Sequence, residues 1–272
     1  MRLYDCHVHS NHSLDARYPM EDMLKAAYEG GLTGIAITDH ADMDFYVPHN
    51  VKARMIDDVA EMRRRKVEWQ GKLDLLVGVE IGQALVLPRE AQEIIDRGEY
   101  DFVISATHSV RNMGGFYSMG MADCSEADID DFLRRYFNEI IEMIAVTDFD
   151  TLPHLSYPLR YIRQAVKFPV DLFPYESYIQ KIMNMLVDGG KAYELNLKPY
   201  APGDEAWRAE ECWLLDLFKA AGGREITLGT DAHVPEKVGY GLSEGIRMLK
   251  DCGFDHYTIY RQRKACPIML ED

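Results

Sequence analysis

Side chains that bind metal ions recur in six short motifs, which are spread over most of this sequence. Each motif contains histidine or an acidic residue, and both offer a lone pair to a divalent cation. In the first motif two histidines lie two positions apart, so an extended chain points both to the same side. In chain order the motifs are HVH, TDH, GVE, ATH, LPH and GTDAH, and their candidate ligands are His7, His9, His40, Glu80, His108, His154, Asp231 and His233.

The chemistry of this set favours zinc, manganese or iron. Imidazole nitrogens and carboxylate oxygens are ligands that suit these ions. A lone histidine such as His40 or His154 would be weak evidence, since a single histidine is often structural. The whole set, however, exceeds the four ligands of one tetrahedral site. It therefore predicts two or three divalent ions, with a carboxylate such as Glu80 bridging two of them.

Each motif closes a short apolar run that is typical of a β-strand, and amphipathic stretches between the runs are typical of helices. Pro88 suits a first helical turn and Ser243 suits an N-cap, while Gly30, Gly189 and Gly222 stand where C-cap glycines occur. The expected strands are residues 2–6, 34–38, 73–79, 102–106, 149–152, 192–195 and 226–229, and the expected helices are 20–29, 52–70, 88–97, 126–146, 175–188, 208–221 and 243–252.

This alternation of strands and helices indicates an α/β fold with a parallel sheet, either a barrel or an open doubly wound sheet. Residues 110–125 are expected to form the longest loop. The carboxyl ends of parallel strands meet on one face, where the active sites of such folds are built. We therefore expect the six motifs to converge on that face.

Length and composition predict a single domain over residues 1–272. A formal net charge of −15 argues against nucleic-acid and anionic-membrane partners, which need a basic surface. The N-terminus lacks the pattern of a secretory signal, and five scattered cysteines without a CxxC pair favour reduced thiols. We expect a cytoplasmic protein, and the sequence does not indicate its oligomeric state.

Taken together, the six motifs resemble those of the polymerase and histidinol phosphatase (PHP) superfamily. The closing GTDAHVPEKVG is similar to the histidinol-phosphatase branch in particular, and the likeness extends from about His7 to Gly239. The resemblance implies a distorted (β/α)7 barrel, similar to a TIM barrel, that holds three divalent metals. The implied ligand sets are His7, His9, Glu80 and Asp231 for the first metal, Glu80, His108 and His154 for the second, and His40, His233 and Asp15 for the third.

One member of the third set is open to choice. The superfamily places a His, Asp or Glu in the loop after His9, and both His12 and Asp15 stand there. We favour Asp15. The residues expected to be catalytic are Glu80, Asp231 and His233.

The implied activity is hydrolysis of a small phosphorylated alcohol by a metal-bridging hydroxide, with L-histidinol phosphate as the expected substrate. The sequence has neither a GxxxxGK[ST] loop nor a cysteine followed six residues later by arginine, which agrees with a mechanism without a phospho-enzyme. The alternatives are a nucleotide phosphodiester or sugar phosphate as substrate, a non-catalytic metal-binding module, and hydrolysis of C–N bonds. Arg160, Lys198 and Arg111 are the candidate phosphate-binding residues, and Tyr117 and Tyr161 are further candidates for specificity.

Overall fold

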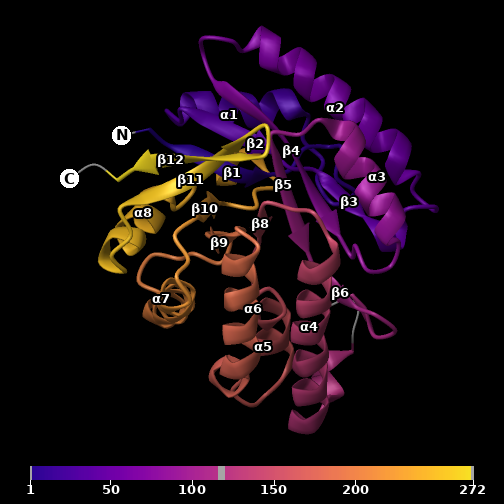
Figure 1. Ribbon diagram of the computed structural model, residues 1–272, viewed down its shortest axis with the longest axis vertical. Helices are drawn as coiled ribbons and strands as arrows, with labels where there is room; N and C mark the ends of the chain where they lie inside the picture. The colour runs from indigo at the N-terminus through magenta and orange to yellow at the C-terminus, as the bar shows by residue number, and fades with distance from the viewer. Residues whose placement is uncertain (1, 116–119, 271–272) are drawn as a thin grey trace.

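Parallel β-strands form the centre of the structure and helices surround them (Figure 1). The computed structural model describes residues 2–115 and 120–270. The strands pair in parallel, and their order across the sheet is also their order along the chain. The bounds are β1 (Tyr4–Val8), β2 (Gly34–Ile37), β4 (Asp74–Gly82), β5 (Phe102–Ala106), β8 (Thr151–Leu152), β9 (Ala192–Asn196) and β10 (Ile226–Gly229).

The two edges of this sheet meet and bring it close to a closed barrel. A parallel bridge joins Val8 in β1 to Ala232, just past β10, and the amide of His9 donates to the Ala232 carbonyl over 2.9 Å. The prediction of a distorted seven-stranded barrel is confirmed. A further short strand, β3 (His40–Asp42), pairs with the end of β4 and sets His40 opposite Glu80.

Every residue of β1, β2, β5, β9 and β10 is buried, because the helices cover the outer face of the barrel. This double burial explains why the strands are near-continuous apolar runs in the sequence. No helix in the described part of the chain has the length and hydropathy that a membrane crossing requires. The helices are α1 (Met20–Glu29), α2 (Val51–Glu68), α3 (Pro88–Gly98), α4 (Glu126–Val146), α5 (Leu159–Ala165), α6 (Glu176–Asp188), α7 (Glu205–Ala220) and α8 (Leu242–Asp251).

Side-chain caps open α4 and α7, where Ser125 and Asp204 are the N-caps. A capping box opens α4, because the Ser125 hydroxyl accepts from the Asp128 amide and the Asp128 carboxylate accepts from the Ser125 amide. The N-cap prediction for Ser243 was wrong. Gly241 is the N-cap of α8, at a φ of 83° that suits glycine, and Ser243 lies inside the helix.

Residues 241–245 have the GxSxG spacing of a nucleophile elbow, but no strand leads directly into them.

Two other regions differ from expectation. Residues 110–125 are not one loop, since β6 (Ser109–Val110) and β7 (Gly114–Gly115) pair as a short antiparallel ladder and a 3-10 turn, η2, covers Met121–Asp123. The chain also continues past α8 into an antiparallel hairpin of β11 (His256–Arg261) and β12 (Lys264–Met269). This hairpin contacts the amino ends of the barrel strands, where the Tyr257 hydroxyl accepts from the amide of Tyr4.

Candidate metal centre

Glu80 lies at the centre of a buried cluster at the carboxyl end of the barrel. Its Oε2 atom is 3.3 Å from His7 Nε2 and 2.9 Å from His40 Nδ1. Its Oε1 atom is 3.3 Å from His108 Nε2 and 3.1 Å from His154 Nε2. Three strand ends (β1, β5 and β8) and β3 therefore bring four imidazoles to one carboxylate. Glu80 itself lies within β4, which continues two residues beyond it.

Asp231 and Asp15 extend the cluster on a second side. The Asp231 Oδ1 atom lies 3.3 Å from His9 Nε2 and 3.5 Å from His233 Nδ1. The other ring nitrogen of His233, Nε2, is 3.0 Å from Asp15 Oδ2. The second Asp15 oxygen, Oδ1, is 3.7 Å from His40 Nε2. The structure thus brings together all nine side chains for which a ligand role was predicted.

Unsatisfied atoms in this cluster fit divalent metals. His7 Nε2, His9 Nε2, His40 Nδ1 and Glu80 Oε2 are buried without a hydrogen-bond partner among the described residues. Buried polar atoms are otherwise nearly always paired, because an unpaired one loses its contact with water and gains nothing. Among the described residues, ligand atoms lie within 4.8 Å of one another in three groups: His9 with His40 and His233, His7 with His9 and Glu80, and His40 with Glu80 and His108.

Hydrogen bonds on the far side of several rings fix which nitrogen faces the cluster. His7 Nδ1 lies 2.7 Å from a Glu194 oxygen, and His108 Nδ1 lies 3.2 Å from an Asp42 oxygen. The Ser13 hydroxyl donates to Asp39 and therefore accepts from His9 Nδ1, at 3.1 Å. A proton on Nδ1 leaves the Nε2 lone pair free, which is the form that binds a metal.

The sequence reasoning missed Glu194. This residue is buried in β9, and it accepts from the His154 amide (3.2 Å) and the Asn196 side chain (2.8 Å) as well as holding His7. A carboxylate in the middle of an apolar strand was the available signal, because such a group must have a partner inside the barrel. Asn196 follows it by two residues and points to the same side.

The backbone around the cluster is strained or tightly packed. His154 (φ 28°) and Asp231 (φ 50°) are in the left-handed region, which side chains other than glycine rarely adopt. Such residues persist only where their surroundings hold them, and they gather at functional sites. A Cβ on Gly229 would lie 2.4 Å from both His7 Cβ and Glu194 Oε1, so only glycine fits there.

Electrostatics favour the metal-binding forms of Glu80 and His9. Nearby carboxylates outweigh burial and raise the pKa values of His7, His40 and His108, so these rings must release a proton when a metal binds. Burial opposes charge on Glu80, but His7, His40 and His108 outweigh it and hold the pKa of this carboxyl well below its usual value. Burial and the neighbouring rings of His40 and His233 lower the pKa of His9. An ionised carboxylate beside a neutral imidazole is the pair of states that metal binding requires.

Two of the three predicted cations lie beside Asp231. Lys198 Nζ is 2.9 Å from Asp231 Oδ1, and Arg160 Nη1 is 3.4 Å from Asp231 Oδ2. Arg111 is placed elsewhere, since its guanidinium pairs with Glu139 and Glu142 on α4. A role for Arg111 in phosphate binding therefore stays a prediction that no contact supports.

The structure separates the two candidates in the loop after β1. Asp15 reaches the rings of His40 and His233, whereas His12 Nε2 contacts Glu61 on α2 at 3.1 Å. This placement favours Asp15. Tyr161 lines the cavity over the cluster, and Tyr117 is outside the described residues.

A cavity of about 570 Å³ opens over the cluster and is large enough for a small molecule. Its lining combines cluster residues with side chains from other elements, namely Leu14, Asp15, His40, Asp42, Asp44, Phe45, Gln83, His108, Ser109, Tyr157, Tyr161, Lys198, Asp231 and His233.

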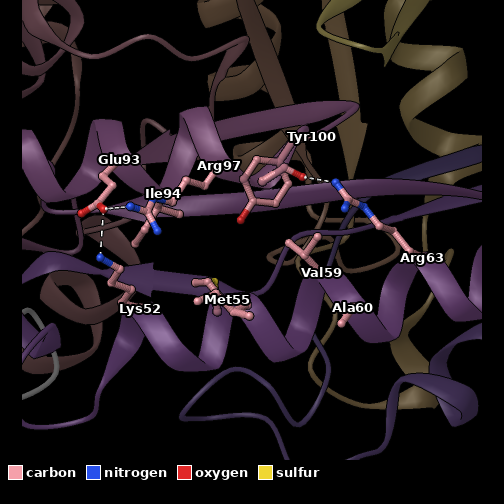
Figure 2. A pocket seen from close by; sticks show the side chains of 11 residues that line it. Lys52, Met55, Val59, Ala60, Arg63, Glu93, Ile94, Arg97 and Tyr100 are labelled. Carbon is pink, nitrogen blue, oxygen red and sulfur yellow. Dashed lines mark hydrogen bonds and ion pairs between the residues drawn. The ribbon is translucent and has the colours of Figure 1, made fainter.

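Figure 2 shows a second concave region, a groove of about 260 Å³ between α2 and α3. Its floor is apolar and includes Met55, Val59 and Tyr100. Its charged residues pair with one another or with nearby groups, as Glu93 does with Lys52 (2.9 Å) and Arg97 (2.7 Å). The groove contains none of the cluster residues, so the cavity over Glu80 is the candidate functional site.

Comparison with known proteins finds relatives of similar sequence and similar fold. A solved histidinol phosphate phosphatase from Lactococcus lactis subsp. lactis, complexed with zinc, L-histidinol and phosphate, has a TM-score of 0.83 at 22% identity, over 97% of this chain and 99% of that one. The histidinol-phosphatase of Lactococcus lactis subsp. lactis is 25% identical over 97% of this chain and 96% of its own length. A probable histidinol-phosphatase of Deinococcus radiodurans is 26% identical over 97% and 99%. The PHP domain model matches residues 5–198, which is more than half of the sequence, and the chain therefore belongs to the PHP domain family.

Proposed function

We propose that this chain is a metal-dependent phosphomonoesterase that hydrolyses L-histidinol phosphate to L-histidinol and phosphate, a step of histidine biosynthesis. The observation that carries the proposal is the group of imidazoles around Glu80. Several of them have a buried ring nitrogen without a hydrogen-bond partner, and the group lies beneath a cavity. The choice of substrate is supported by the two relatives, which match this chain over nearly their full length and are named histidinol-phosphatase and probable histidinol-phosphatase.

The proposed metal ligands form three sets, and two of these sets share Glu80. Bound divalent ions would lower the pKa of coordinated water and offset the charge of the transferring phosphoryl group. Zinc, manganese and iron all suit these ligands, and three ions are proposed because the side chains exceed what two tetrahedral sites need. The sets are His7, His9, Glu80 and Asp231, then Glu80, His108 and His154, and finally His40, His233 and Asp15.

Arg160 and Lys198 are proposed to bind the phosphate. The Arg160 guanidinium is oriented by the Asn196 side chain at 2.7 Å, and it lies over the Tyr157 ring at 5.5 Å. Lys198 lines the cavity, with its ammonium between Asp231 and His233. A cation next to the metal ligands stabilises charge as it develops on the phosphoryl oxygens. Asp231 holds both cations in place, which adds a positioning role to its proposed role as a ligand.

We further infer that residues 1–272 act as one domain in the cytoplasm, without nucleic-acid or membrane partners. Two features support one domain. Asp231 and His233 lie beyond the PHP-matched segment and yet join the cluster, and the C-terminal hairpin contacts β10 and β5. The net charge of −15 supports the absence of nucleic-acid and membrane partners.

The test is phosphate release from L-histidinol phosphate by purified protein loaded with zinc or manganese, beside a panel of nucleotide and sugar phosphates. The proposal predicts that kcat/KM is highest for L-histidinol phosphate. Faster hydrolysis of another ester would keep the metal-dependent chemistry and replace the substrate. No hydrolysis by protein whose bound metal has been verified would favour a non-catalytic module or hydrolysis of C–N bonds.

A further inference from the structure

The cavity over the metal centre has an acidic side chain that the proposed chemistry does not use. Asp44 lies in a 3-10 turn, η1 (Met43–Phe45), which follows β3 directly. Asp44 is an exposed residue, and it lines the same cavity as Lys198 and His233. Phe45, the next residue, lines the cavity too.

Every other carboxylate in the lining is paired. Asp15 pairs with His233 (3.0 Å), Asp42 with His108 (3.2 Å) and Asp231 with Lys198 (2.9 Å). Asp44 has no hydrogen-bonded or ion-paired side chain within the described ranges 2–115 and 120–270. It is thus the one lining carboxylate of this part of the chain that is available to a ligand.

An unpaired carboxylate raises a difficulty in a site for phosphate esters. A phosphate monoester is anionic near neutral pH, so a second negative charge in the same cavity opposes its binding. The opposition disappears when the alcohol part of the ester carries a positive charge, because that charge can pair with the carboxylate. The phosphate can then lie on the metals, Arg160 and Lys198.

We propose that Asp44 binds a cationic amine of the substrate, so that this site selects phosphate esters of amino alcohols over neutral esters of the same size. The inference rests on the proposed phosphomonoesterase function and names its specificity residue. L-histidinol phosphate carries such an amine two carbon atoms from its phosphate ester oxygen. Phe45 and Leu14 offer apolar surface to the rest of the skeleton.

The experiment compares two substrates that differ only in the amine. They are L-histidinol phosphate and its deamino analogue, 3-(imidazol-4-yl)propyl phosphate, each assayed with wild type and Asp44→Asn. The substitution should raise KM for the amine substrate about tenfold and leave kcat nearly unchanged, since a charge-assisted hydrogen bond made in both ground and transition state is lost. For the deamino analogue, kcat/KM should stay the same or rise.

Asp57→Asn is the matched control, because Asp57 is an exposed carboxylate on α2 that does not line the cavity. It should leave both substrates unaffected. Equal losses of kcat/KM on both substrates in Asp44→Asn would show that Asp44 has a structural role. Unchanged kinetics would show that Asp44 faces solvent and does not contact the substrate. Either result overturns the proposal.

The amine subsite and the proposed phosphatase activity can fail separately. Failure of wild type to hydrolyse L-histidinol phosphate would contradict the function. The amine preference would then be read from calorimetric binding of L-histidinol and its deamino alcohol to wild type and Asp44→Asn. A loss of affinity in the variant for L-histidinol alone would support the subsite, and no such difference would overturn it.

Discussion

The two ends of the barrel both contain buried acidic side chains, and they differ in what surrounds those acids. At the amino end, Asp150 accepts from Arg263 (2.6 Å) and from the Val103 amide (2.8 Å). Asp101, nearby, accepts from Lys66 and from two backbone amides. At the carboxyl end, one oxygen of Glu80 and the nearby ring nitrogens of His7, His9 and His40 are buried without a hydrogen-bond partner among the described residues.

This difference separates a structural polar network from a binding site. A buried acceptor costs less free energy when it accepts a hydrogen bond. The carboxylates at the amino end therefore have their hydrogen-bond donors within the protein itself. The carboxyl end brings together nitrogen and oxygen atoms that can act as acceptors, and a bound metal cation would give these atoms a partner. The first arrangement should therefore govern folding stability, and the second should govern metal binding and turnover.

Removal of the central acceptor should give the largest effect on activity. Glu80→Gln keeps the size of the side chain and removes the charge shared by two of the proposed metal sets. We expect kcat/KM to fall by about 1000-fold or more, since the electrostatic stabilisation of the site is lost. A variant that retains most of its activity would break the comparison.

The next effect should come from a residue that only positions a ligand. Glu194→Gln loses the charge that holds His7 Nδ1 at 2.7 Å. We expect zinc affinity, measured by calorimetric titration, to fall by about 10- to 100-fold, as is usual when the partner of a ligating imidazole is altered. Glu176→Gln, at an exposed site in the first turn of α6, is the control and should leave zinc affinity unchanged.

The amino end should respond in stability and not in activity. Arg263→Ala leaves Asp150 without its cation, and we expect the free energy of unfolding to fall by about 2 kcal/mol. The control is Arg135→Ala, which breaks an exposed pair with Asp131 on α4 and should cost about 0.5 kcal/mol or less. The kcat of folded Arg263→Ala should match wild type. A loss of kcat without a loss of stability would contradict the assignment of this end.

The smallest effect should be a pH dependence of the free energy of unfolding, caused by a buried acid with neutral partners. Glu211 lies on α7 with neutral partners, the hydroxyls of Ser156 and Tyr193, and burial raises its pKa to about 8. The folded state therefore holds a proton that the unfolded state releases near pH 4.5, so the contribution to stability declines as pH rises from about 4.5 to 8. Glu211→Gln should lose less stability than wild type between pH 5 and pH 8 in urea unfolding. An identical pH dependence in both proteins would contradict this.

Most of the barrel could be predicted because its strands are buried on both faces and therefore read as apolar runs. The bounds expected for β5, β10, α1 and α4 agree with the structure. The C-terminal hairpin could not be predicted in the same way. Its turn residues, Gln262 and Arg263, both have positive φ without the glycine or asparagine that normally signals such a turn. Backbone hydrogen bonds from both residues to Asp101 hold the turn, and that contact is tertiary.

The same distinction applies to the candidate site. Residues at strand ends could be found because parallel strands deliver their carboxyl ends to one face. Glu194 was missed because it lies within a strand, and Asp44 because it lies in a short turn whose approach to the cavity depends on β3. The placement of Arg111 could not be inferred either, since its partners on α4 are about 30 residues away in sequence.

The most direct test of this account is hydrolysis of L-histidinol phosphate by protein that has first been stripped of metal with a chelator. We predict no phosphate release from the stripped protein and recovery on titration with zinc or manganese, with a break at two to three ions per chain. Turnover that persists when metal analysis finds no bound ion would contradict the claim that the cluster around Glu80 is a metal centre for catalysis.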